Sequence, residues 1–145
     1  MRKLLMVANV LMFLLLPVMM AWAEGPTDIL VIANKGVALD SISKDTLADL
    51  FLKKKGVKDN AGNDLVPINA PEGSPLRDAW AKRVLGMDAG SEVAYWKKML
   101  VASGTQAPKS LPNTMAAAFS VKGAISYIKR SDYKEGVAKV LAVIP

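Results

Sequence analysis

The sequence predicts an α/β sandwich of three layers (α/β/α), in which helices cover both faces of a mostly parallel sheet. Two observations predict this class. Short apolar runs of strand length alternate along the chain with helical patterns, and the first run, residues 28–33 (DILVIA), is almost continuously apolar, as in a strand buried on both faces. No internal repeat or low-complexity tract appears, so residues 24–145 are expected to form one domain with its own core.

The N-terminus has the pattern of a secretory signal peptide. Arg2 and Lys3 precede an apolar stretch over residues 4–20, and the Ala-Trp-Ala sequence of residues 21–23 provides a cleavage site. Cleavage after residue 23 implies secretion, and because the chain has no Cys we expect a periplasmic domain rather than a small extracellular one. An uncleaved membrane anchor is the alternative, because the apolar run approaches the ~17 residues that can span a bilayer. No Cys follows the run, which excludes a lipoprotein anchor.

The first half of the remaining chain reads as strand, helix, turn, strand and helix. Ser43 is a suitable N-cap for a helix over residues 44–52, where Lys53 to Lys55 and Gly56 are expected to close it. A turn cluster at residues 59–64 leads to a strand over 65–68. The next helix is predicted from Ser74 to about residue 85, with Pro75 at its first position.

The second half contains two further helices and two strands. Asp88 or Ser91 caps a helix that carries Trp96 and Leu100, and Ser103-Gly104-Thr105 is read as its end or as a loop. A polar connection over residues 102–112 follows. Asn113 is expected to cap a short helix over 114–120, and strands are predicted over 123–128 and 137–144.

Composition narrows the function classes. The chain has no Cys and no His, which removes thiolate and imidazole catalysis, disulfides and most transition-metal sites. A Ser nucleophile would need Lys or a carboxylate as base, and Ser74 with Lys82 has no evident third group to orient it. The formal net charge of +6 is modest and two units of it belong to Arg2 and Lys3, so nucleic-acid binding is not expected. We therefore expect no enzyme, no cofactor and no metal.

The segment between the second strand and the following helix has the features of an anion site. A helix that begins just beyond a strand presents free N–H groups and a positive dipole end. Gly73 has no side chain to block the access of an anion to the helix N-terminus, and Ser74 can cap the helix or donate to the anion. Arg77 adds a positive charge in the first turn of the helix. Arg77 can instead pair with Asp78 or Glu72 on the surface.

Two residues after the first strand are further candidates. Ligands in open α/β sheets bind outside the carboxyl ends of strands, so Asn34 and Lys35 are candidate contacts for the same anion.

Three motifs in order resemble a known family. They are residues 41–52 (SISKDTLADLFL), 73–80 (GSPLRDAW) and 123–127 (GAISY). Together they resemble the phosphate-binding proteins of phosphate ABC transporters, which have a type II periplasmic binding protein fold. The resemblance implies one lobe of that fold and phosphate contacts at Gly73 and Ser74. It also implies a transporter, porin or sensor as partner.

The chain departs from that family in two respects. Family members have two lobes that close around phosphate, whereas this chain has room for one. The family loop reads Gly-Ser-Gly-Thr, but Pro75 and Leu76 occupy the last two positions here, and the upstream Arg of the family falls on Ala70. We therefore expect weak binding of phosphate or a similar oxyanion, without chemistry. The alternative is a protein-interaction module that retains no small ligand, in which a partner protein or a second copy replaces the missing lobe.

Overall fold

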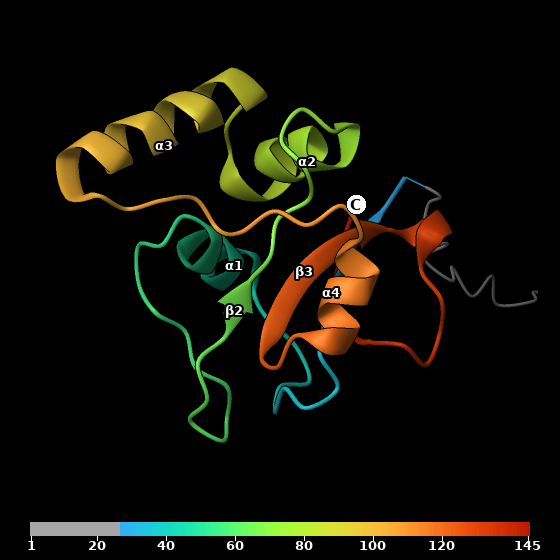
Figure 1. Ribbon diagram of the computed structural model, residues 1–145. Coiled ribbons are helices and arrows are strands. Elements are labelled where there is room, and N and C mark those ends of the chain that lie inside the picture. Colours follow the sequence, from blue (N-terminus) through green and yellow to red (C-terminus); the bar gives the residue numbers. More distant parts are fainter. Residues whose placement is uncertain (1–26) are drawn as a thin grey trace, which may run out of the picture.

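The computed structural model describes residues 27–145, so the predicted signal peptide lies outside the described residues. Four strands form one sheet in the order β2-β3-β1-β4, with bounds β1 Ile29–Ala33, β2 Val66–Pro67, β3 Ala124–Lys129 and β4 Lys139–Ile144. Figure 1 labels β2 and β3 of this sheet together with the four α-helices. The helices are α1 Lys44–Phe51, α2 Pro75–Trp80, α3 Ala89–Ser103 and α4 Thr114–Ser120. A π-helical segment, η1 Ala81–Leu85, continues α2, and a 3-10 turn, η2 Arg130–Asp132, follows β3.

Helices cover both faces of the sheet, which confirms the predicted three-layer class. On one face Val31 and Tyr127 pack against α1 and the α2–η1 helix, through Leu47 and Trp80. On the other face Ile32 packs against α4. Because β1 is buried along its whole length, its side chains contribute alternately to the two cores.

The prediction of a mostly parallel sheet is wrong. β1 runs antiparallel to both of its neighbours, β3 and β4, and only the short β2–β3 pair is parallel. The apolar run of β1 reflects a central strand covered on both faces, which an antiparallel sheet also produces when helices cover it. β2 is short and lies at the edge, where the missing N–H of Pro67 is tolerated.

The helix boundaries follow the predicted caps. The side chains of Ser43, Ser74, Asp88 and Asn113 each accept a backbone N–H at the start of their helix. Gly104 ends α3 in the left-handed region, as predicted for a Gly C-cap. The predicted end of α1 is incorrect, because the helix stops at Phe51 with Leu52 as its C-cap, before the lysines.

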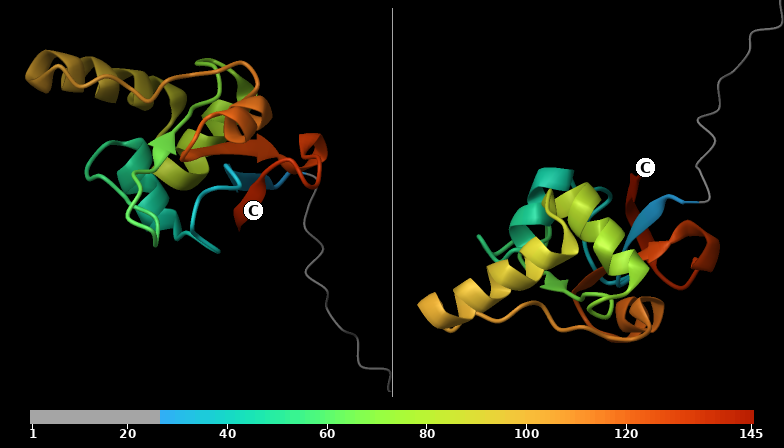
Figure 2. Two further views of the ribbon diagram at one scale, coloured as in Figure 1. Left: turned by 60° about the horizontal axis from the view of Figure 1, so that its bottom comes forward. Right: turned by 90° about the horizontal axis from the view of Figure 1, so that it is seen from above.

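The C-terminal part of α3 projects away from the rest of the molecule in two views (Figure 2). Only Glu92 and Trp96 of this helix are buried, while Leu100 and Val101 are 50% and 89% exposed. Within residues 27–145, no helix is long and apolar enough to cross a membrane.

Candidate functional site

The Gly73–Ser74 turn lies where the sequence places it, at the start of α2. Gly73 has φ +79°, and apart from its two neighbours in the chain no residue has an atom within 4 Å of the position that a Cβ would occupy, so the approach to the helix is open. The Ser74 hydroxyl accepts from the Arg77 backbone N–H at 3.3 Å and donates to the Pro71 carbonyl at 2.7 Å. Ser74 is therefore a helix cap, and its one hydroxyl proton is directed to the backbone.

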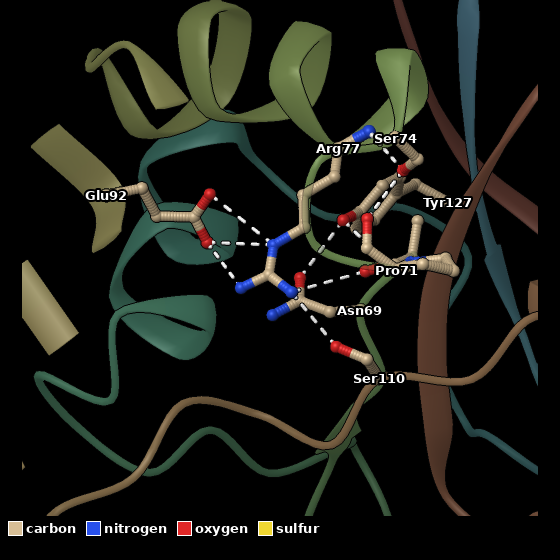
Figure 3. A network of polar contacts seen from close by, with 8 residues as sticks. Asn69, Pro71, Ser74, Arg77, Glu92, Ser110 and Tyr127 are labelled. Atoms are coloured by element: carbon tan, nitrogen blue, oxygen red, sulfur yellow. Dashed lines mark hydrogen bonds and ion pairs between the residues drawn. The ribbon is translucent and has the colours of Figure 1, made fainter. Parts of the chain in front are cut away.

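Arg77 is not a free cation. Its side chain is 5% exposed and forms an ion pair with Glu92 at the start of α3 (Figure 3). Its Nη2 donates to Glu92 Oε1 at 2.9 Å, and its Nε lies 3.1 Å from the same oxygen and 3.4 Å from Oε2. The expected surface partners Asp78 and Glu72 are thus incorrect. The ion pair is buried, and its carboxylate comes from another helix.

The same guanidinium also joins two loops. Its Nη1 donates to the Ser110 hydroxyl at 2.9 Å and to the Ala70 carbonyl at 3.3 Å. Arg77 therefore ties the turn before α2 to α3 and to the connection before α4. All of these partners are acceptors, and they engage most of the N–H groups with which the guanidinium could bind an oxyanion.

Tyr127 holds the backbone before α2 in place through its hydroxyl and its ring. Its hydroxyl donates to Asn69 Oδ1 at 3.0 Å and accepts from the Ala70 N–H at 3.1 Å, and its ring stacks on Trp80 with centroids 4.1 Å apart. Burial raises the pKa of the Tyr127 phenol well above its usual value, although the Ala70 hydrogen bond acts in the opposite direction. The core thus fixes the backbone that leads into α2.

Asn34 and Lys35 do not join this turn. β1 runs antiparallel to β3, whereas β2 runs parallel to β3. The carboxyl ends of β1 and β2 therefore point in opposite directions along the strands. Asn34 Nδ2 donates to the Ala118 and Phe119 carbonyls at 3.0 and 2.9 Å, at the end of α4, and Lys35 is exposed. The expected single site with both residues is not formed, because it assumed parallel strands.

The hollow beside Gly73 carries more negative than positive charge. It has a volume of about 220 Å³, and Arg77 is the only cationic side chain in its wall. Three carboxylates, those of Glu72, Asp78 and Glu92, line the same hollow. An oxyanion placed there meets net repulsion, which weakens any binding at this position.

Sequence reasoning missed Glu92, Asn69 and Ser110. Glu92 lies 15 residues beyond Arg77 and Ser110 lies 33 beyond it, so no local spacing signals these pairings. Glu92 lies in the first turn of α3, where a carboxylate is also favoured by the helix dipole alone, so its position in the sequence does not indicate an ion pair. Within residues 27–145, no group of three or more potential ligands could hold a metal ion.

Among protein families, curated proteins and solved structures, only solved structures match the chain. No protein-family model matches the chain, and no curated protein matches it. Among solved structures, a putative phosphate ABC transporter substrate-binding protein with bound phosphate from Clostridium perfringens has a TM-score of 0.58 at 18% identity, covering 80% of this chain and 45% of that one.

Two other solved structures show the same likeness. An ABC-type phosphate transport receptor from Vibrio cholerae has a TM-score of 0.58 at 9% identity and covers 80% of this chain and 46% of its own. PstS from Borrelia burgdorferi has a TM-score of 0.58 at 13% identity, with 79% and 46% covered. This chain thus spans less than half the length of these proteins, and its fold is that of a single lobe of a phosphate ABC transporter substrate-binding protein.

Proposed function

We propose that this protein is a periplasmic, non-catalytic binding protein that takes phosphate or a similar oxyanion weakly, in phosphate uptake or sensing. Its fold supports the proposal, since three solved proteins with that fold are described as phosphate-transport binding proteins and one holds phosphate. A signal peptide over residues 1–23 and a single binding domain over 24–145 belong to the same proposal.

The Gly73–Ser74 turn at the start of α2 is the observation that carries the proposal. Gly73 leaves the approach to the helix open, and the first N–H groups of a helix have no partner inside it. The N–H of Leu76 and the Ser74 hydroxyl, after rotation away from Pro71, can face an anion there. Asn34 and Lys35 are not part of this site.

The same geometry explains why binding should be weak. Arg77 is held by Glu92, Pro75 has no N–H to donate, and a single lobe leaves the anion in contact with water. Each charge-assisted hydrogen bond that is missing costs ~1.5–3 kcal/mol. We expect a Kd on the order of 1 mM for phosphate at low salt.

Titration calorimetry of phosphate and sulfate into the purified protein tests the proposal. Ser74→Ala should abolish the binding heat. Ser43→Ala is the matched control, because Ser43 caps α1 by the same side-chain contact but has no glycine turn before it. Equal loss in both variants, or the absence of heat up to ~10 mM phosphate in the unmodified protein, would reject oxyanion binding at this turn.

A protein-interaction module is the second candidate, and the internal pairing of Arg77 with Glu92 favours it. The exposed apolar side chains Leu100 and Val101 on the projecting end of α3 are available to a partner protein or a second copy. Sedimentation velocity of the protein and of Val101→Lys tests the second copy: self-association that the variant abolishes supports this candidate, and a concentration-independent monomer rejects a homodimer.

A further inference from the structure

A separate cavity lies on the opposite side of α2 from the acidic hollow. It has a volume of about 320 Å³. Leu76 and Ala79 of α2 line it, at the i and i+3 positions of one helical face, together with Arg83 of the following segment η1. Arg77 and Asp78, which line the acidic hollow, lie on the other side of the helix. The two cavities share no lining residue.

The charge of this cavity is opposite to that of the hollow beside Gly73. Arg83 and Lys129 line it, and no Asp or Glu does. Within residues 27–145, neither cation forms a salt bridge. Two cations that converge on one cavity without a carboxylate attract an anion by their uncompensated charge.

Arg83 is held in place rather than free to fold away. Its Nη1 donates to the Thr27 carbonyl at 2.8 Å, which anchors the guanidinium beside the start of β1. The fork of an anchored guanidinium can still present its remaining N–H groups to a carboxylate or phosphate. Lys129 is exposed and supplies a second positive charge at the end of β3.

Apart from Thr27 and Ser131, the remaining lining residues are apolar. Ile29, Leu76 and Ala79 form this part of the wall, and Ser131 adds a hydroxyl. The volume is at the small end of the ~300–1,000 Å³ typical of ligand pockets. A bare inorganic ion would leave the apolar wall wet, whereas a short hydrocarbon chain would cover it.

We propose that this cavity binds a small organic anion, with a carboxylate or phosphate head at Arg83 and Lys129 and a short apolar chain on Ile29, Leu76 and Ala79. This site lies on a different face of α2 from the acidic hollow, although Pro75 and Leu76, which follow Ser74 in the chain, also line it. The two head groups share the chemistry that the cations recognise, and the experiment distinguishes them.

Titration of the purified protein with hexanoate, hexyl phosphate, hexanol and inorganic phosphate tests the proposal at low salt. Hexanoate or hexyl phosphate should bind at least about tenfold more tightly than hexanol, because hexanol lacks the charge. The better of the two anions identifies the head group. Lys129→Gln should weaken the binding of that anion by about two- to fivefold, and the double variant with Arg83→Gln should weaken it by about tenfold or more.

Two further variants separate a real cavity from general charge attraction. Ala79→Leu fills the apolar part of the cavity. It should weaken the binding of the organic anion and leave the binding of inorganic phosphate unchanged. Lys97→Gln removes an exposed lysine from α3, outside the cavity, and should change nothing. Ser74→Ala should likewise leave the organic anion unaffected, which separates this site from the phosphate proposal.

The proposal is overturned if neither organic anion binds, or if Lys129→Gln and Lys97→Gln weaken binding equally. Arg83→Gln also removes the bond to Thr27, so a thermal melt of each variant accompanies the titration. Because Lys129 is exposed and unpaired with any described carboxylate, its variant keeps the test valid even if the Arg83 variant fails to fold.

Discussion

At the scale of single residues, the buried pair of Arg77 and Glu92 decides what the candidate anion turn can do. A buried arginine whose donors meet Glu92, Ala70 and Ser110 contributes to the connection of three segments. The carboxylate of Glu92 stands where an external oxyanion would otherwise meet the guanidinium. The residue that most resembled a ligand contact in the sequence is thus primarily a structural one.

Arg77→Ala should destabilise the protein strongly. Removal of the guanidinium leaves Glu92 buried without a partner, which costs ~3–5 kcal/mol in unfolding free energy. The double variant Arg77→Met, Glu92→Leu should recover most of this loss, because it buries no unpaired charge. Urea denaturation measures both. A loss below ~1 kcal/mol for Arg77→Ala would contradict the assigned pairing.

Tyr127→Phe should cost ~1–3 kcal/mol, because it leaves the Ala70 N–H and Asn69 Oδ1 without their partner. Tyr133→Phe is the matched control: its hydroxyl makes one partly buried bond, to the Ala138 carbonyl, and its removal should cost ~0.5–1.5 kcal/mol. Denaturant midpoints of the two variants provide the comparison. Equal or reversed losses would contradict the buried role of Tyr127.

The buried phenol of Tyr127 should make the protein less stable at alkaline pH. Burial raises the pKa of Tyr127 in the folded protein above the value of 10.0 for an unfolded chain. Its contribution to stability is therefore complete below pH 10 and is lost as the pH rises toward the folded pKa. The unfolding free energy should fall more steeply above that pH in the unmodified protein than in Tyr127→Phe.

At the scale of elements, turn chemistry and caps were predicted well, and strand direction was not. The turn at residues 59–64 shows the local case. Asp59 accepts from the N–H groups of Ala38, Ala61 and Asn63, and so ties the turn to the segment after β1. A short polar side chain that satisfies nearby N–H groups is readable from sequence, but the distant partner Ala38 is not.

Asp59 should give the protein a dependence on acid pH. The hydrogen bond from the Ala38 N–H, followed by that from Asn63, lowers the pKa of the Asp59 carboxyl below 3.8. Its contribution to stability is present above that pH and is lost as the pH falls through the lowered pKa. Thermal melts between pH 7 and pH 2 should show a shallower acid-side decline for Asp59→Asn, and identical slopes would contradict this role.

At the scale of the whole molecule, β1 couples the two faces of the sheet. Val31 belongs to the core under α1 and α2, and Ile32 belongs to the core under α4. A strand shared by two cores makes it difficult for either face to unfold alone. The projecting end of α3 makes the smallest contribution to this packing, because its buried residues lie in its first half.

We therefore expect one cooperative unfolding transition. Ile32→Ala should lower the unfolding free energy by ~2–5 kcal/mol and shift the far-ultraviolet and tryptophan signals together, although Trp80 lies on the other face. Val140→Ala, at a position 38% exposed on β4, is the control and should have a much smaller effect. Two separate transitions in calorimetry would contradict this coupling.

The element order, the helix caps and the one-lobe α/β class could all be predicted from the sequence. These features depend on short-range chemistry: Ser43, Ser74 and Asn113 cap their helices through backbone groups only three residues away. The alternation of apolar runs with helical patterns was likewise sufficient for the layers.

The direction of β1 and the chemistry of the candidate site depend on contacts between distant parts of the chain. An apolar run has no direction, so the sequence could not show that β1 opposes β3 and separates Asn34 and Lys35 from Ser74. The pairing of Arg77 with Glu92 and the convergence of Arg83 and Lys129 on one cavity join residues far apart in the chain. Long-range packing brings such charges together, and local sequence patterns cannot predict it.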